Sequence, residues 1–270
     1  MSGASDTGNI RDTGHIIQGV TNMIDLESIK AGLENGEFTL EYLPIVSLDS
    51  ERCVGVEALV RWQRPAGVIF PDDFVPLIEN TPLSGLVTYW VIDQVALELG
   101  DWLRNEDNVE LHINVPPELL GRGGLEYAAQ KSGLSDVRHK VVLEITERGL
   151  PDQLGLQALD LAAGQGVRIA LDDVTIDPAN VLVLSRTHAN IIKIDKSVLL
   201  DDHQGTGTPR WAEALGVLLR TTDLGVIVEG VETAEQISLL RAAGVKQAQG
   251  YYFSPPLPAQ EFLHYFARQG

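Results

Sequence analysis

Carboxylate, amide and amine side chains recur within or just after the short apolar segments of this 270-residue chain. Seven segments contribute them: Glu57, Asn114, Glu144, Asp172 with Asp173, Lys193, Glu229 with Glu232, and Gln249. Glu57, Glu144 and Glu229 lie between aliphatic residues, and burying an unpaired carboxylate costs several kcal/mol, so a cation should neutralise them. Oxygen ligands of this kind suit Mg²⁺ or Mn²⁺ better than Zn²⁺, for which His and Cys would be expected.

Each of these residues, taken alone, has a simpler interpretation. Asp172 and Asp173 could cap a following helix, and Arg61 could pair with a surface carboxylate. Lys193 would usually be solvated at a strand end, although its isoleucine neighbours favour a buried stem. His112 alternates with Asn114 along one segment, and we interpret it as core packing, because no two of the six histidines form a spaced pair. The recurrence at seven segments is what favours a common site.

The elements that must position these side chains are strands alternating with helices. Amphipathic stretches separate eight apolar, β-rich segments, namely FTLEYLPIV, CVGVEALV, VELHINV, VVLEI, VRIAL, ANIIKI, LGVIVEG and VKQAQGYYF. This alternation over about 230 residues predicts an α/β fold, a TIM-like (β/α)8 barrel, in which the strand ends converge on one face. The connection SLDSER is too short for a crossover helix, so we expect the first strand to be antiparallel to the second.

Two helices have distinct signals in the sequence. Apolar residues recur near the 3.6-residue period over 84–104. In the segment TAEQISLLRAAG, Thr233 and Gln236 match a capping box and Gly244 provides a stop.

Composition excludes several classes of protein. The net charge of −18 makes a nucleic-acid polymer an improbable partner, and no stretch approaches the roughly 18 apolar residues of a membrane span. The single cysteine, Cys53, cannot form an intrachain disulfide or a thiolate zinc site, which predicts a cytoplasmic protein with a buried, inert thiol. Residues 1–22 are polar and lack periodicity, so we predict a flexible leader there and one barrel domain over 23–270.

Glu57-Ala58-Leu59, continued by VRW, resembles the signature of EAL-domain proteins, the cyclic di-GMP phosphodiesterases. The resemblance extends from about Leu26 to Phe266. It includes the motifs PDDFVPLIE (71–79), LHINVPPELL (111–120), LEITE (143–147), ALDD (170–173), IIKID (191–195), VIVEGVET (226–233) and QGYYFSPPLP (249–258). Seven motifs in order make the resemblance specific, whereas three letters alone would not.

The resemblance implies hydrolysis of cyclic di-GMP to linear pGpG with one or two Mg²⁺ or Mn²⁺ ions. It assigns one metal to Glu57, Asn114, Glu144 and Asp172, and a second metal or the orientation of the attacking water to Asp172, Asp173 and Glu229. It places Lys193 beside that water, gives Glu232 and Gln249 supporting roles in the site, and lets Arg61 contact a phosphate of the ligand.

The chain departs from the family pattern after the paired aspartates. It reads VTIDPAN over 174–180, where active members usually have a Phe-Gly-x-Gly-x-Ser-Ser loop, and Pro178 restricts the backbone there. The family partner of Glu147 in that loop is therefore in question. Leu43 replaces a usual Gln, and Pro116 replaces a usual Ser.

These departures leave two functions open. One is a working phosphodiesterase, either slow or dependent on a separate regulatory protein. The other is a degenerate EAL domain that acts as a non-catalytic cyclic di-GMP receptor or as a protein-interaction module. We favour the enzyme because every carboxylate is retained. A barrel enzyme that forms a Schiff base on Lys193 is disfavoured, since neighbouring carboxylates would raise the pKa of the lysine. Family members often form homodimers near the altered loop, so a dimer is open here.

Overall fold

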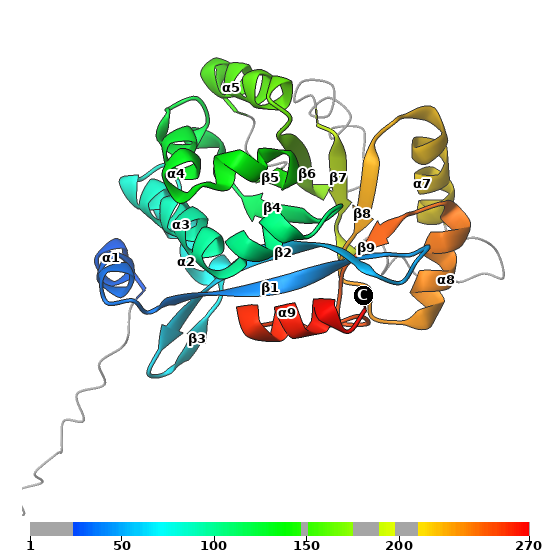
Figure 1. The fold of residues 1–270 in the computed structure, drawn as a ribbon, viewed down its shortest axis with the longest axis horizontal. Coiled ribbons are helices and arrows are strands. Elements are labelled where there is room, and N and C mark those ends of the chain that lie inside the picture. Colours follow the sequence, from blue (N-terminus) through cyan, green and yellow to red (C-terminus); the bar gives the residue numbers. More distant parts are fainter. Residues whose placement is uncertain (1–23, 147–150, 175–188, 198–209, 270) are drawn as a thin grey trace, which may run out of the picture.

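The computed structural model of the chain describes residues 24–146, 151–174, 189–197 and 210–269. Nine strands form one sheet, and eight of them close into a barrel (Figure 1). The barrel strands, in chain order, are β1 (Phe38–Ser47), β2 (Cys53–Arg64), β4 (Glu110–Asn114), β5 (Val141–Thr146), β6 (Arg168–Val174), β7 (Ile191–Ile194), β8 (Gly225–Val228) and β9 (Gln247–Ala248).

The directions of the strands confirm the predicted barrel with its antiparallel first strand. Strand β1 runs antiparallel to both of its neighbours, β2 and β9, whereas the other barrel strands pair in parallel. The remaining strand, β3 (Gly67–Ile69), pairs with the end of β2 and lies outside the barrel. Its three residues were too few for a periodic signal, and the sequence did not predict it.

Helices surround the barrel (Figure 1). They are α1 (Leu26–Glu34), α2 (Pro71–Ile78), α3 (Pro82–Asn105), α4 (Gly124–Ser132), α5 (Gln153–Gly164), α7 (Arg210–Thr221), α8 (Ala234–Ala243) and α9 (Ala259–Ala267), with the 3₁₀ segments η1 (Pro117–Leu119) and η2 (Leu134–Lys140). Helix α3 confirms the helix predicted over 84–104. Helix α8 has the predicted capping box between Thr233 and Gln236, and it ends at Gly244 in the left-handed conformation.

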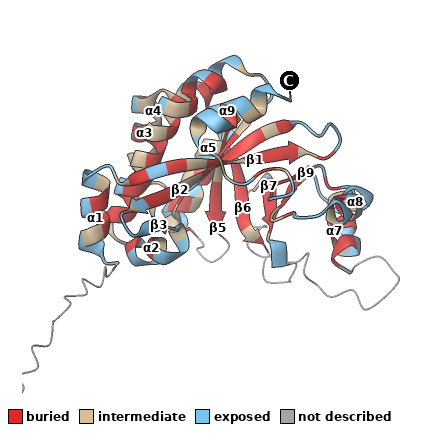
Figure 2. Ribbon diagram, turned by 90° about the horizontal axis from the view of Figure 1, so that it is seen from below, coloured by how far each residue is buried: buried red, intermediate tan, exposed pale blue. Residues whose placement is uncertain are grey.

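The main core lies between the strands and the helices that cover them, and Figure 2 shows buried strands with exposed outer helix faces. A smaller apolar cluster fills the inside of the barrel: Ile45, Val142, Ala170, Ile191 and Ile227. Side chains alternate between the two faces of a strand, so residues two positions further along β5, β6, β7 and β8 also point inward. Those residues are Glu144, Asp172, Lys193 and, directly after the end of β8, Glu229, and the apolar cluster forms the floor beneath them.

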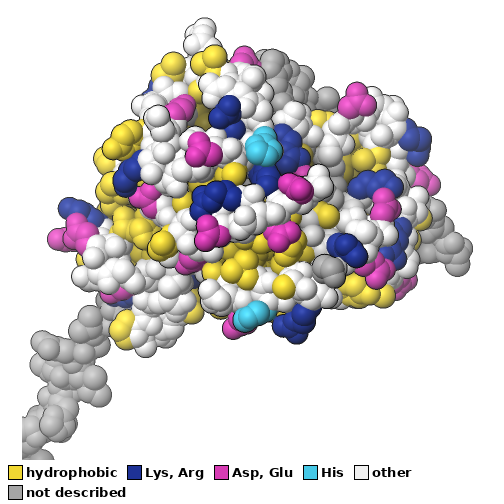
Figure 3. Space-filling view, viewed as in Figure 1, with side chains coloured by type: hydrophobic (Ala, Val, Ile, Leu, Met, Phe, Trp, Pro, Cys, Tyr) yellow, Lys and Arg dark blue, Asp and Glu magenta, His cyan; other side chains and the backbone are white. Residues whose placement is uncertain are grey.

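Other expectations from the sequence concern the surface and the thiol. Figure 3 shows acidic and basic side chains interspersed over one face, without a large patch of either charge. None of the helices in the described part of the chain has the length and apolar composition needed to cross a membrane. Cys53 is buried, as predicted, and burial raises the pKa of its thiol to about 12. The leader predicted over 1–22 lies outside the described residues.

Candidate metal centre

The carboxyl ends of the parallel strands bring acidic side chains from four strands around one lysine. Lys193, on β7, is fully buried, and its Nζ lies 2.9 Å from Glu57 Oε2, 2.9 Å from Glu144 Oε1, 3.3 Å from Asp172 Oδ1 and 2.8 Å from Glu229 Oε1. Burial alone would lower the pKa of Lys193, but the four carboxylates, Asp172 foremost, raise it well above its ordinary value. A lysine that keeps its proton is a poor nucleophile, which argues against Schiff-base chemistry.

Two amide side chains hold the carboxylates in place. Gln249 Nε2, just after β9, donates to Glu57 Oε2 and to Glu229 Oε1, both at 2.7 Å. Asn114 Nδ2, at the end of β4, donates to Glu57 Oε1 at 3.1 Å. Each oxygen of Glu57 therefore has a partner from a different strand, and its orientation is fixed.

One ammonium group cannot neutralise the carboxylates that meet here. Burial, followed by repulsion from Glu57 and Asp173, raises the pKa of Asp172 even though Lys193 acts in the opposite direction. Burial also raises the pKa of Glu229 well above its ordinary value, with Asp172 and Glu57 adding to the effect. Titratable groups whose pKa is strongly perturbed by burial and by neighbouring charges are typical of functional sites.

The donor set fits divalent metal ions. Oxygen atoms of Glu57, Glu144 and Asp172 lie within 4.8 Å of one another, as do oxygen atoms of Asp172, Asp173 and Glu229. Among the described residues, Glu144 Oε2 is buried without a hydrogen-bond donor, and the buried Asp172 Oδ1 makes no polar contact beyond its ion pair with Lys193 Nζ at 3.3 Å. Buried acceptors without donors are costly, and hard cations such as Mg²⁺ and Mn²⁺ bind such oxygens. Asp172 belongs to both groups and could bridge two ions.

A bulge in β6 presents both aspartates to the site. The pairing of β6 with β7 shifts register between Leu171 and Val174, and Asp173 has a positive φ of 58°. In a regular strand, consecutive side chains point to opposite faces, but the extra residue of a bulge can turn one of them toward the same face as the residue before it. This explains how consecutive residues, Asp172 and Asp173, can both belong to one acidic group.

His112, interpreted from the sequence as core packing, makes polar contacts instead. It is fully buried on β4, and its Nδ1 lies 2.8 Å from Glu144 Oε1. Its Nε2 lies 3.4 Å from Glu110 Oε2. Burial acts to lower the pKa of His112, but the hydrogen bonds with Glu110 and Glu144 outweigh it and raise the pKa. The signal in the sequence was the polar alternation of Glu110, His112 and Asn114 along one strand.

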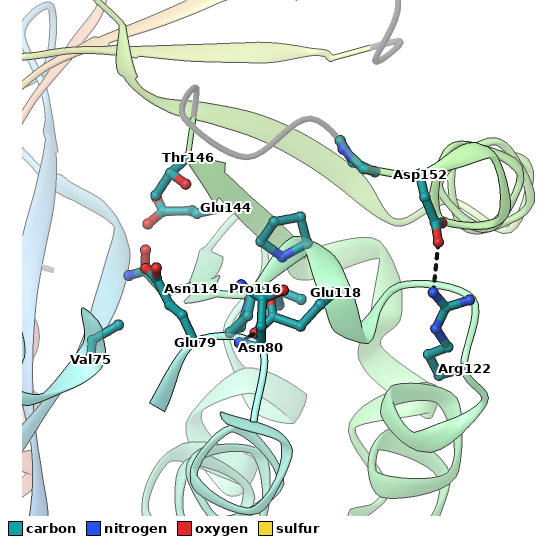
Figure 4. A pocket seen from close by; sticks show the side chains of 13 residues that line it. Val75, Glu79, Asn80, Asn114, Pro116, Glu118, Arg122, Glu144, Thr146 and Asp152 are labelled. Atoms are coloured by element: carbon teal, nitrogen blue, oxygen red, sulfur yellow. Dashed lines mark hydrogen bonds and ion pairs between the residues drawn. The ribbon is translucent and has the colours of Figure 1, made fainter. Parts of the chain in front are cut away.

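A cavity of about 500 Å³ opens beside the acidic cluster. Figure 4 shows Asn114, Glu144 and Thr146 together on one side of it, with the paired Arg122 and Asp152 on the other. Arg122 Nη2 lies 2.6 Å from Asp152 Oδ2. The cavity gives a ligand access to the oxygen-rich end of the barrel.

Comparison with known proteins identifies the family of the chain. The family model described as "EAL domain" matches residues 26–256. The chain belongs to the EAL domain family.

This EAL domain is 31% identical over 245 residues to "Probable cyclic di-GMP phosphodiesterase PdeB" of Escherichia coli (strain K12), and the match covers 88% of the chain and 46% of PdeB. It is 32% identical over 254 residues to "Cyclic di-GMP phosphodiesterase PdeL" of the same organism, covering 90% of the chain and 68% of PdeL. The chain thus spans about half of PdeB and two-thirds of PdeL.

Solved structures share the fold of this EAL domain. The structure titled "PaMucR Phosphodiesterase, c-di-GMP complex" superposes with a TM-score of 0.77 at 29% identity, over 88% of this chain and 98% of that chain. The structure titled "Structure of EAL Enzyme Bd1971 - cAMP and cyclic-di-GMP bound form" has a TM-score of 0.77 at 28% identity, over 89% of this chain and 67% of that chain.

Most of the candidate residues of the EAL domain meet in this cluster: Glu57, Asn114, Glu144, Asp172, Asp173, Lys193, Glu229 and Gln249. Arg61 is buried, and among the described residues it shares no hydrogen bond or ion pair with the cluster; its Nε donates to Glu41 Oε2 at 2.7 Å and its guanidinium lies over the Phe70 ring. Glu232 is exposed in the loop before α8, and within the described residues its side chain shares no hydrogen bond with the cluster.

Two of the departures from the family pattern lie within the described residues. Leu43 lies opposite Glu57 in the pairing of β1 with β2, and Pro116 lines the cavity. Residues 175–180 of the altered loop, and Glu147, lie outside the described residues.

Proposed function

We propose that this EAL domain hydrolyses one phosphodiester bond of cyclic di-GMP to give linear pGpG, with Mg²⁺ or Mn²⁺ as cofactor. The observation that supports this most is the pair of carboxylate groups that share Asp172, together with Glu144 Oε2, which is buried without a donor among the described residues. Relatives at about 30% identity are named as cyclic di-GMP phosphodiesterases, and their names support cyclic di-GMP as the substrate in this proposal.

Glu57, Asn114, Glu144 and Asp172 would hold the first ion, and Asp172, Asp173 and Glu229 would hold a second. Bound divalent ions lower the pKa of water and neutralise charge on phosphoryl oxygens during in-line displacement. Glu229 and Asp173 would orient the attacking water. Lys193 Nζ lies between 2.8 and 3.3 Å from four carboxylates and would add positive charge beside that water.

On the substrate side, Arg61 would contact a phosphate. Its guanidinium is held by Glu41, by the carbonyl of Val60 at 3.0 Å and by the Phe70 ring at 5.3 Å. A planar guanidinium fixed on several sides loses little entropy when it binds an anion. Gln249 would support the site through Glu57 and Glu229, and Glu232 would act from the loop before α8.

Turnover of cyclic di-GMP by the purified chain tests the proposal. We expect pGpG to form with Mn²⁺ or Mg²⁺ and not with EDTA, and we expect Glu57→Ala to abolish its formation. Glu261→Gln, an exposed acid in the first turn of α9, is the matched control and should retain activity. Tight binding of cyclic di-GMP without turnover under either metal would instead establish the receptor function, and neither binding nor turnover would favour an interaction module.

Three further features of the proposal concern the whole protein. We propose a homodimer, which light scattering on the purified chain would detect as twice the monomer mass. A separate regulatory protein would raise turnover when added to the chain. The cytoplasmic location stays a prediction from the single cysteine.

A further inference from the structure

A chain of polar side chains runs inside the barrel to the metal centre. It begins at Arg168, on the first residue of β6, whose Nη1 donates to Glu110 Oε1 at 2.6 Å. Glu110 Oε2 lies 3.4 Å from His112 Nε2, and His112 Nδ1 lies 2.8 Å from Glu144 Oε1. Arg168 is one-third exposed, whereas His112 and Glu144 are fully enclosed. The chain therefore connects the opposite end of the barrel with a proposed metal ligand.

We propose that His112, held by Glu110 and Arg168, is a positioning residue that directs Glu144 toward the metal ion. This inference rests on the proposed function, because it assumes that Glu144 is a ligand.

The two oxygens of Glu144 have different surroundings. Oε1 lies 2.8 Å from His112 Nδ1 and 2.9 Å from Lys193 Nζ. Oε2 is buried without a hydrogen-bond partner among the described residues. A free carboxylate could exchange its oxygens by rotation, but the donor on His112 fixes which oxygen points away. Oε2 is left to bind a cation.

Simple packing does not explain a histidine at this position. The neighbouring inward-facing residues on the floor of the barrel are apolar, and an imidazole costs more to desolvate than an aliphatic side chain. Both ring nitrogens are instead placed against carboxylates of Glu110 and Glu144. Partners that orient a metal ligand typically contribute 10–100-fold to metal affinity.

Two amide variants separate positioning from packing. In His112→Asn, the amide nitrogen replaces Nδ1 and can still donate to Glu144. In His112→Gln, the amide nitrogen replaces Nε2, so the contact with Glu110 is retained and the donor to Glu144 is lost. The two variants therefore differ mainly in whether the amide donates to the carboxylate of Glu144 or to that of Glu110. Circular dichroism would verify that both fold.

The measurement is the Mn²⁺ dissociation constant of the full chain, from electron paramagnetic resonance of free Mn²⁺, without substrate. We expect His112→Gln to weaken binding about 10–100-fold and His112→Asn to stay within about 3-fold of wild type. The spectrum of the bound ion should change in His112→Gln only. If folding prevents measurement of His112→Gln, His112→Ala supplies the comparison, because it also removes the donor to Glu144. It should weaken Mn²⁺ binding in the wild-type background and leave it unchanged in the Glu144→Gln background.

The outcomes are distinguishable. Equal Mn²⁺ affinity in wild type and His112→Gln would overturn the inference and leave the proposed function intact. Equal weakening in both amide variants would also overturn it, since the histidine would then act through packing. No Mn²⁺ binding by the wild type would overturn the proposed function itself.

Discussion

Replacing Lys193 by methionine should destabilise the metal-free protein by about 3–5 kcal/mol, because removing one partner of a buried ion pair leaves uncompensated buried charge. The ammonium of Lys193 contacts four carboxylates at distances between 2.8 and 3.3 Å, and the side chain is fully buried. Methionine fills a similar volume, so the decrease in the free energy of unfolding measures mainly the removal of the positive charge. Proton uptake by Asp172 and Glu229, whose pKa values are raised by burial, would limit this destabilisation, which should therefore be larger at pH 8 than at pH 5.

Urea unfolding followed by circular dichroism measures this loss, with EDTA and with Mn²⁺. Mn²⁺ at 100 times its dissociation constant should stabilise the wild type by about 2.7 kcal/mol. The matched control is Lys246→Met, which removes an exposed pair with Asp49, also at 2.9 Å. Exposed pairs contribute about 0–1 kcal/mol, so the control should scarcely change the free energy of unfolding. Equal effects of Lys193→Met and Lys246→Met would refute the electrostatic account of the site.

Other predictions concern stability, pH and reactivity. Thr233→Ala removes the cap of α8 and should cost about 1 kcal/mol in urea unfolding, whereas Ser238→Ala, within the same helix, should cost less; equal costs would contradict the capping argument. In metal-free protein, the raised pKa values of Asp172 and Glu229 let the folded state bind protons that the unfolded state has released. Their contribution to the free energy of unfolding should therefore fall as pH rises above about 4.5. The double variant Asp172→Asn, Glu229→Gln should show a weaker dependence of this free energy on pH in urea titrations, and an unchanged dependence would contradict the prediction. The Cys53 thiol, with its pKa near 12, should react with a thiol reagent at neutral pH only after unfolding, so rapid labelling of native protein would disprove its burial.

The sequence predicted the barrel because its strands carry a local signal. Alternation fixes which side chains face inward, and the ends of parallel strands converge whatever the details of their packing. The residues Glu57, Glu144 and Glu229 were therefore found from their apolar flanks alone, before any distance was known. The resemblance to the EAL family added their roles.

The features that the sequence did not predict depend on contacts between distant residues. Sequence spacing does not connect His112 with Glu144, because Glu144 follows it by 32 residues and becomes its neighbour only through the pairing of β4 with β5. The bulge at Asp173 depends on how β6 meets β7. The partner of Arg61, Glu41, lies on the antiparallel strand β1, and no spacing rule connects the two.

Anomalous diffraction from crystals soaked in Mn²⁺ tests the central claim most directly. The account predicts a Mn²⁺ peak at coordination distance from oxygens of Glu57, Asn114, Glu144 and Asp172, with Glu144 Oε2 among its ligands. Full Mn²⁺ occupancy at other acidic residues, with no peak at these four, would contradict it.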